Sequence, residues 1–320
     1  MILSNAGGQV LVAGSANVDY VVRAPHIPTP GETVLGGDLT IVPGGKGANQ
    51  AVAAARSSGA ATVMLAALGN DAAAETLERS LAGAGVLLHA VRSNSPTGAA
   101  LITVSETGEN AITVAPGANM ALAPTDLPDL AGIAWLVLQL ETPIDTVTAF
   151  AQAARTAGVK VLLNTAPARA LPAELLAAVD VLVANEEELA CVAGEDGSIA
   201  DRLATIGTSI AIVTLGARGS CALANGVFHL QPAFGVRAID TTAAGDTFCG
   251  ALAGALGQGQ LLPEAMRFAS AAAALATTRA GAQSSIPVRD EVERLIAGGI
   301  VDPTASADLA AYCGVTVQPS

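Results

Sequence analysis

The chain has 320 residues, 51% of them hydrophobic, and carries a net charge of −13 at pH 7. A protein this acidic is poorly suited to nucleic acid or to an anionic membrane surface, so neither is expected as its main partner. Its length allows one large domain or two smaller ones. Lys46 and Lys160 are its only lysines, so an anion site would depend on backbone N–H groups, arginine and a metal ion.

The four cysteines are scattered and form no C-x-x-C pair. This usage is typical of reduced thiols and predicts a cytoplasmic protein. The N-terminal stretch MILSNAGGQVLVAGS lacks a basic start with a long apolar run, and no run of about 18 strongly apolar residues follows it. We therefore expect neither a secretory leader nor a membrane-spanning segment.

Short apolar runs alternate with alanine-rich helical patterns along most of the chain. In chain order the patterns predict a strand over 9–15, a helix over 48–60, a strand over 61–69, a helix over 71–85, a strand over 134–141, a helix over 144–158, strands over 160–167, 180–188 and 209–219, and a helix from Thr247 onward. Continuous Val, Ile and Leu strands with helices between them are typical of a parallel sheet covered on both faces. The predicted fold is therefore a three-layer α/β sandwich.

Two regions, 19–45 and 97–119, have strand-like pieces and no helix. We expect lid strands from about 18–43 and 97–116 to form a small antiparallel sheet, because ligands of α/β proteins bind beyond the carboxyl ends of the parallel strands. A surface elaboration or a dimer contact is the alternative. The pattern indicates a single domain over 1–297, followed by a tail over 298–320 that is either loose or a short appended helix.

Two glycine-containing stretches precede or follow predicted elements near the N-terminus. GSANVD places Asn17 and Asp19 after the first strand, where they are either ligands or ordinary turn residues, and its single glycine is no dinucleotide fingerprint. PGGKGANQ offers Lys46 and Asn49 beside glycines that let a ligand approach the backbone. It is no Walker A loop, because no Ser or Thr follows the lysine. A tight turn is the alternative.

Acidic side chains follow two of the predicted strands. The NEEE stretch, residues 185–188, is either a solvated helix start or a site that orders Mg²⁺ through water. Glu141, which closes the run LVLQLE, is either a cap or a ligand for hydroxyl groups.

The stretch DTTAAGDTFCGAL, residues 240–252, combines small residues, a helix start and an aspartate. Backbone N–H groups at a helix start attract anions. A carboxylate at that place is explained if Asp246 accepts the proton of a hydroxyl that attacks a phosphoryl group. The alternative is that Asp246 merely caps the helix.

These stretches resemble the ribokinases of the PfkB carbohydrate kinase family over roughly residues 9–296. The resemblance rests on GSANVD, PTPGET, GGKGANQAVAAAR, QLETP, NTAPAR, NEEE, TLGARG, DTTAAGDTFCGAL and GAQSSIP. AAGDTF is specific to the family, and GGKGANQA is more specific, because other branches usually lack the lysine. The resemblance implies a ribokinase-like fold and transfer of the ATP γ-phosphate to the 5-hydroxyl of D-ribose, with Mg²⁺ accompanying ATP. It also implies a homodimer formed through the lid strands.

The resemblance assigns roles to residues that match the family pattern. Asp246 would be the general base. The sugar would be held by Asn17, Asp19, Gly45, Lys46, Gly47, Asn49, Glu141 and Asp246. ATP would contact Asn185, Thr214, Leu215, Gly216, Ala217, Arg218, Gly219, Ala244, Gly245 and Ser270, with Ala244 and Gly245 as the anion hole. Glu188 would organise Mg²⁺ through water. An activating K⁺ would be held, largely through backbone oxygens, by Asp240, Thr242, Ala276, Arg279, Gly281 and Ser285.

Ser270 departs from the family pattern, which often has His or Asn near the adenine. Three hypotheses other than a ribose kinase can be weighed against the sequence. The first is a kinase of the same family for 2-deoxyribose, another sugar or a nucleoside. The second is a sensor on the same fold that binds sugar or nucleotide without catalysis, but such a protein needs no base such as Asp246. The third is a Rossmann-type oxidoreductase, which fails because the glycine-rich first turn is missing.

Overall fold

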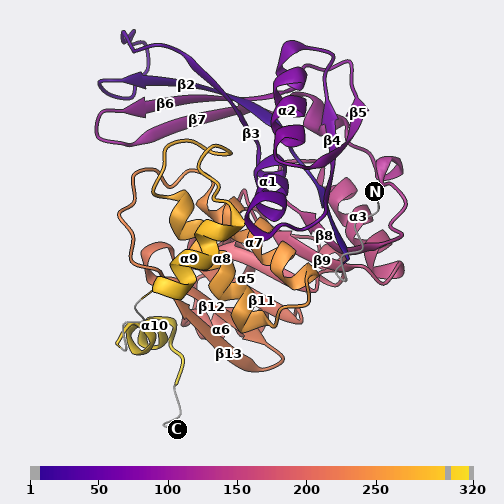
Figure 1. Ribbon diagram of the computed structural model, residues 1–320, viewed down its shortest axis with the longest axis vertical. Coiled ribbons are helices and arrows are strands. Elements are labelled where there is room, and N and C mark those ends of the chain that lie inside the picture. The colour runs from indigo at the N-terminus through magenta and orange to yellow at the C-terminus, as the bar shows by residue number, and fades with distance from the viewer. Residues whose placement is uncertain (1–7, 300–303, 317–320) are drawn as a thin grey trace.

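The computed structural model describes residues 8–299 and 304–316, so the expectations for residues 1–7, 300–303 and 317–320 lie outside the described part. Its large sheet has the strand order β13-β12-β11-β10-β9-β8-β1-β4-β5 (Figure 1). The strands are β1 (Gln9–Ala13), β4 (Thr62–Leu68), β5 (Leu87–Arg92), β8 (Ile133–Leu138), β9 (Lys160–Asn164), β10 (Val181–Asn185), β11 (Ile210–Thr214), β12 (Gly219–Ala224) and β13 (Val227–Pro232).

Seven of these strands, from β11 to β5 in the sheet order, run parallel, and β12 and β13 add an antiparallel edge. The strand β1 lies between β4 and β8, so the chain leaves it in one direction and later returns on its other side. Such a switch point leaves a crevice at the carboxyl ends of the strands, where α/β proteins bind ligands.

Helices cover both faces of the large sheet, as the apolar strands predict. They are α1 (Lys46–Ser58), α2 (Ala72–Gly83), α3 (Ile144–Thr156), α4 (Ala173–Leu176), α5 (Glu186–Ala193), α6 (Ile199–Thr205), α7 (Ala244–Gly257), α8 (Leu262–Ala276), α9 (Arg289–Gly298) and α10 (Ala305–Cys313). Val10 and Val12 of β1 belong to the core shared with α1, α2, α7, α8 and α9. Leu11 and Ala13 belong to the core on the other face, with α3, α5, α6 and α10. The three-layer sandwich is therefore confirmed.

The helices α1 and α7 pack closely against each other, and Gly250 is one reason. A Cβ at this position would collide with the backbone carbonyl of Gln50 on α1. This close approach sets the start of α7 beside the first turn of α1.

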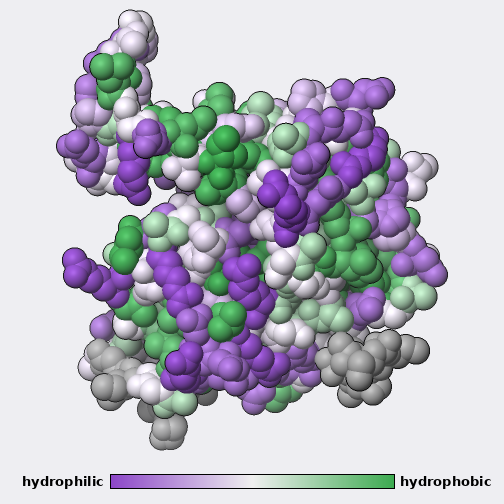
Figure 2. All heavy atoms as spheres, turned by 45° about the horizontal axis from the view of Figure 1, so that its top comes forward, coloured by the Kyte–Doolittle hydropathy of each residue, from purple (hydrophilic) through white to green (hydrophobic). Residues whose placement is uncertain are grey.

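The two strand-rich regions form a second sheet with the order β3-β2-β6-β7. Its strands are β2 (Asn17–Ala24), β3 (Thr40–Gly44), β6 (Gly98–Ser105) and β7 (Asn110–Ala115). The outer pairs are antiparallel, whereas the central pair β2–β6 is parallel because both strands leave the body in the same direction. The sheet projects from the body, and Figure 2 shows a notch between the two. The 3₁₀ turns η1 (Gly117–Ala121) and η2 (Pro124–Asp126) follow β7.

Four predicted strands extend too far at their carboxyl ends. The observed strands β8, β9, β10 and β11 end at Leu138, Asn164, Asn185 and Thr214, where 141, 167, 188 and 219 were expected. The chain turns there into the loops that build the site, so Glu186 already begins α5 and Gly216 begins the 3₁₀ turn η3 (Gly216–Arg218). Similarly, α7 begins at Ala244 rather than at Thr247.

The segment expected as a tail contains the helix α10, which packs against β12, β13 and α6. The appended-helix alternative therefore describes residues 305–313. No helix in the described ranges is long and apolar enough to cross a membrane.

Candidate active site

The carboxylate of Asp246 lies in the first turn of α7 and is held by amide groups from α1. Asn49 Nδ2 donates to Oδ2 at 3.0 Å, and Gln50 Nε2 donates to Oδ1 at 3.1 Å. The position before the helix, Ala243, is left-handed at φ 59° and receives no side-chain capping bond. The capping alternative for Asp246 is therefore not what the structure shows. Each carboxylate oxygen retains a lone pair for a further donor.

The side chain of Gln50 is itself held by other buried amide groups, which the sequence interpretation did not identify. Gln139, just beyond β8, donates from Nε2 to Gln50 Oε1 at 2.8 Å. Gln50 Nε2 also reaches Asn164 Oδ1, at the end of β9, at 3.1 Å. Buried amides with several partners hold one rotamer, so they keep the Asp246 carboxylate in place. The only available signal was polar side chains at the ends of apolar strands.

The glycine turn before α1 brings Lys46 into the same site. Gly45 has a φ of 89°, and a Cβ there would lie 2.6 Å from the backbone nitrogen of Asn17, so only glycine fits without strain. Lys46 lines the cavity described below, and the carboxylate of Asp246 raises the pKa of Lys46 despite its burial. The ammonium group is thus a permanent positive charge next to Asp246.

A second group of polar side chains lies where β2 leaves the body. Asn17 Oδ1 accepts from Asn119 Nδ2 at 2.7 Å, which adds Asn119 as another residue that the sequence interpretation missed. Glu141 Oε2 accepts from Ser15 Oγ at 2.5 Å and from the backbone N–H of Lys46 at 3.1 Å, so it caps α1 as one alternative expected. Its second oxygen can still receive a hydroxyl donor.

Asp19 of β2 is the most perturbed carboxyl group of this cluster. Burial, together with the negative charges of Glu141 and Asp246, raises the pKa of Asp19 to about 7. Asn49 Oδ1 is also buried, with no hydrogen-bond partner among the described residues. Buried acceptors without donors are costly. The cluster is therefore suited to a ligand that brings several hydroxyl donors.

A cavity of about 230 Å³ has Asp246 in its wall. Its lining comes from the carboxyl ends of strands and the start of α7, namely Lys46, Asn164, Ala166, Val183, Asn185, Glu188, Thr214, Thr241, Ala243, Ala244, Gly245, Asp246 and Cys249. Burial raises the pKa of the Cys249 thiol, which stays neutral and unreactive in this wall.

Glu188 is the buried acid of the NEEE stretch. It is 7% exposed, and burial raises its pKa although the Asn185 N–H donates to it at 3.0 Å. The solvated alternative therefore fails for Glu188, while Glu187 is exposed. Among the described residues no cluster of three or more His, Cys, Asp or Glu side chains could hold a metal ion. One buried carboxylate facing the cavity suits Mg²⁺ that arrives with phosphate oxygens and water.

The expected ATP-binding residues are only partly gathered at the cavity. Asn185, Thr214, Ala244 and Gly245 line it, whereas residues 215–219 follow Thr214 beyond the lining. Ser270 is buried within α8 and is also outside the lining. Gly47 lies against the backbone of Ser15.

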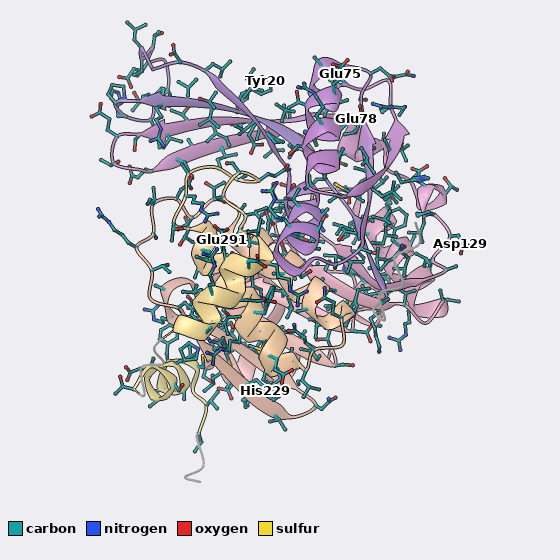
Figure 3. The ribbon with its side chains drawn as sticks, in the orientation of Figure 1. Tyr20, Glu75, Glu78, Asp129, His229 and Glu291 are labelled. Carbon is teal, nitrogen blue, oxygen red and sulfur yellow. The ribbon has the colours of Figure 1, made fainter. Side chains whose placement is uncertain are left out.

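The residues expected to hold K⁺ lie on two loops that Asp240 joins. Its Oδ1 accepts from the backbone N–H and hydroxyl of Thr242 at 2.9 and 2.6 Å, and its Oδ2 accepts from the Gly281 N–H at 2.9 Å. The Arg279 side chain instead pairs with Glu291 of α9, labelled in Figure 3. Ser285 is buried, and Ala276 ends α8, while Asp240 and Thr242 directly precede the start of α7.

The chain is similar to several known ribokinases. A ribokinase of Haemophilus influenzae is 41% identical over 293 residues, covering 88% of this chain and 95% of that protein. The structure of a Thermotoga maritima ribokinase superimposes with a TM-score of 0.85 at 36% identity, covering 91% of this chain and all of that one. An Arabidopsis thaliana ribokinase complexed with ribose and ATP gives 0.83 at 33% identity, covering 91% and 99%.

The profile of the pfkB family of carbohydrate kinases matches residues 8–289, which include every site residue named above. The chain belongs to the pfkB family of carbohydrate kinases.

Proposed function

We propose that the protein transfers the γ-phosphoryl group of ATP to the 5-hydroxyl of D-ribose. The observation that carries this proposal is that Asp246 lines a cavity suited to phosphates and is hydrogen-bonded to Asn49, whose own amide oxygen is buried without a donor. Relatives named ribokinase, one of them solved with ribose and ATP, support the choice of sugar and nucleotide.

The sugar would lie on the side of Asn17 and Asp19, with its 5-hydroxyl directed to Asp246. Ionised Asp19 and the free Oδ1 of Asn49 would accept hydrogen bonds from ring hydroxyls. The proton of the 5-hydroxyl passes to Asp246 as the new O–P bond forms and the bond to the ADP oxygen breaks. Positioning by the amides of Asn49 and Gln50 supplies much of the rate enhancement.

The phosphates would occupy the cavity at the start of α7. The Ala244 N–H already donates to the Thr241 carbonyl at 3.2 Å, so we place the centre of the anion hole at Gly245. Lys46 neutralises charge that develops on the transferred group. Mg²⁺, bound with ATP, neutralises phosphate charge, and Glu188 would order its water ligands.

We further propose that K⁺ binds between the two loops joined by Asp240. The first of these loops leads directly into α7, so a cation there would hold residues 243–245 in the conformation that receives phosphate. Backbone oxygens suit such an ion.

The projecting sheet also supports a homodimer. Ile41 of β3 and Leu101 of β6 are 52% and 57% exposed, and both pair with Tyr20 of β2 in register, so they lie on one face. Exposed apolar groups on adjacent strands mark an interaction surface. We propose that two copies join through it. Leu101→Lys should turn a dimer into a monomer in light scattering, and an unchanged mass would contradict the proposal.

We place the protein in the cytoplasm, because ATP is available there and a reducing environment suits its four free cysteines.

The decisive experiment measures ADP release with Mg·ATP and a panel of ribose, 2-deoxyribose, fructose and adenosine, with and without K⁺. Preference for ribose with stimulation by K⁺ is the expected result. Turnover of another acceptor would be consistent with the proposed mechanism but would overturn the assignment of ribose as the acceptor. No turnover of any acceptor would leave a sensor on the same fold.

A further inference from the structure

The helix α10 lies beyond the part of the chain that the family profile matches, which ends at residue 289. It is nevertheless a fixed part of the body. Leu309, Ala310 and Cys313 are buried against the large sheet. A hydrogen bond with Cys313 raises the pKa of the Cys221 thiol on β12, which places the end of α10 directly on that strand.

Tyr312, next to the buried Cys313, contacts two separate loops. Its hydroxyl donates to Glu186 Oε1 at 2.6 Å. The guanidinium carbon of Arg218 lies 4.1 Å from the centre of its ring, a cation–π distance. One side chain of α10 therefore joins a carboxylate and a guanidinium that come from different parts of the chain.

Both partners of Tyr312 lie next to the cavity assigned to ATP. Glu186 directly follows Asn185, which ends β10 and lines the cavity. Arg218 ends the turn η3, which follows Thr214 of β11, another lining residue. Neighbouring strands β10 and β11 are thus connected beyond their carboxyl ends through Tyr312, which lies outside the family-matched segment.

We propose that Tyr312 is a positioning residue for the nucleotide, and that α10 is part of the ATP site. By holding Glu186 and Arg218, the tyrosine keeps the loops after β10 and β11 in the arrangement that receives ATP. The proposal rests on the proposed function in one respect, namely that the nucleotide binds at the ends of these strands. Tyr312 is not among the residues that line the cavity, so it acts on ATP affinity through Glu186 and Arg218.

The test is calorimetric binding of Mg·ATP and of ADP, which requires no acceptor sugar. Tyr312→Leu removes both contacts and should raise the Kd for Mg·ATP about five- to tenfold. Tyr312→Phe keeps the ring over Arg218 and should raise it about two- to threefold. The KM for ribose should stay unchanged. Asp129→Asn is the control, because Asp129 is exposed and lies on the opposite side of the body from α10 (Figure 3).

Glu186→Ala supplies an independent variant if Tyr312→Leu does not fold. If the hydroxyl acts through Glu186, the double variant Glu186→Ala/Tyr312→Phe should bind ATP as weakly as Glu186→Ala alone. Strictly additive shifts would overturn that coupling. A merely structural role would lower the melting temperature while the Kd for Mg·ATP stays within twofold of the original protein, or it would raise the Kd for ATP and the KM for ribose by the same factor, and either result would overturn the proposal.

The two proposals fail in different ways. A protein that binds Mg·ATP but phosphorylates no ribose overturns the proposed function, and the binding series still decides the role of Tyr312. A protein that binds no nucleotide overturns both.

Discussion

The start of α7 and the base of the projecting sheet hold their carboxylates in opposite ways. Asp246 accepts two amide hydrogen bonds and lies near the charge of Lys46. Asp19 is buried beside other carboxylates, and its pKa rises to about 7. Both oxygens of the Asp246 carboxylate therefore already accept hydrogen bonds, whereas Asp19 lies among other negative charges. Under the proposed function, this difference implies that the base is held in place before the substrates bind, while the sugar brings hydrogen-bond donors to its own binding site.

The largest effect is expected when the Asp246 carboxylate at the start of α7 is replaced. Asp246→Asn keeps the shape of the side chain but removes the proton acceptor, so kcat should fall about 10²–10⁴-fold. Ribose and ATP should still bind nearly as before, as calorimetry can check. Asp129→Asn, at an exposed position remote from the site, is the matched control (Figure 3). Loss of binding with normal residual turnover would show that Asp246 is not the base.

A smaller effect is expected at Asp19, and it depends on pH. Ribose hydroxyls need the ionised form of Asp19 as an acceptor, so kcat/KM for ribose should rise as the pH passes through about 7. Asp19→Asn should flatten this rise and lower kcat/KM about 10- to 100-fold at pH 8. The same inflection persisting in the variant would assign the titration to another group.

The same carboxyl group should cost the free protein stability. The pKa of Asp19 is about 7 when folded against a reference of 3.8, so between these values the folded state holds more protons. Its contribution to the unfolding free energy therefore falls as pH rises through this window and levels off above about 7. In urea unfolding, we expect the unfolding free energy of Asp19→Asn, relative to that of the original protein, to increase by about 2–3 kcal/mol between pH 5 and pH 8. A constant difference would mean that Asp19 is not strained in this way.

The layers could be predicted from the sequence because apolar strand and helix patterns are local signals, and Lys46 and Asp246 could be singled out for the same reason. Glycines beside Lys46 and the small residues before Asp246 mark turns that need no tertiary information. What the sequence could not reveal depends on contacts between distant segments. Gln139 meets Gln50 across 89 positions, and Tyr312 meets Glu186 across 126. A polar side chain in a helical or strand pattern carries no local sign of such a partner.

The strand ends illustrate the same limit. Apolar patterns continue past Asn164 and Thr214, so strands were expected to run on where the chain actually turns into the site. The pattern of apolar and polar residues also did not indicate that β2 and β6 pair in parallel, because the relative direction of two strands depends on the path of the chain between them.

The smallest effect is expected at the two loops joined by Asp240, and it tests whether they, like the start of α7, keep their arrangement without a ligand. The Thr242 hydroxyl donates to Asp240, but the backbone N–H groups of Thr242 and Gly281 also hold that carboxylate. Thr242→Val removes the hydroxyl alone and keeps the backbone carbonyl that the proposal gives to K⁺. Stimulation of turnover by K⁺ should therefore change less than about twofold, because one of several bonds to Asp240 is lost. If stimulation disappears, the Thr242 hydroxyl is itself required. The two loops joined by Asp240 then depend on bound K⁺ in the way that the cluster around Asp19 depends on a bound sugar.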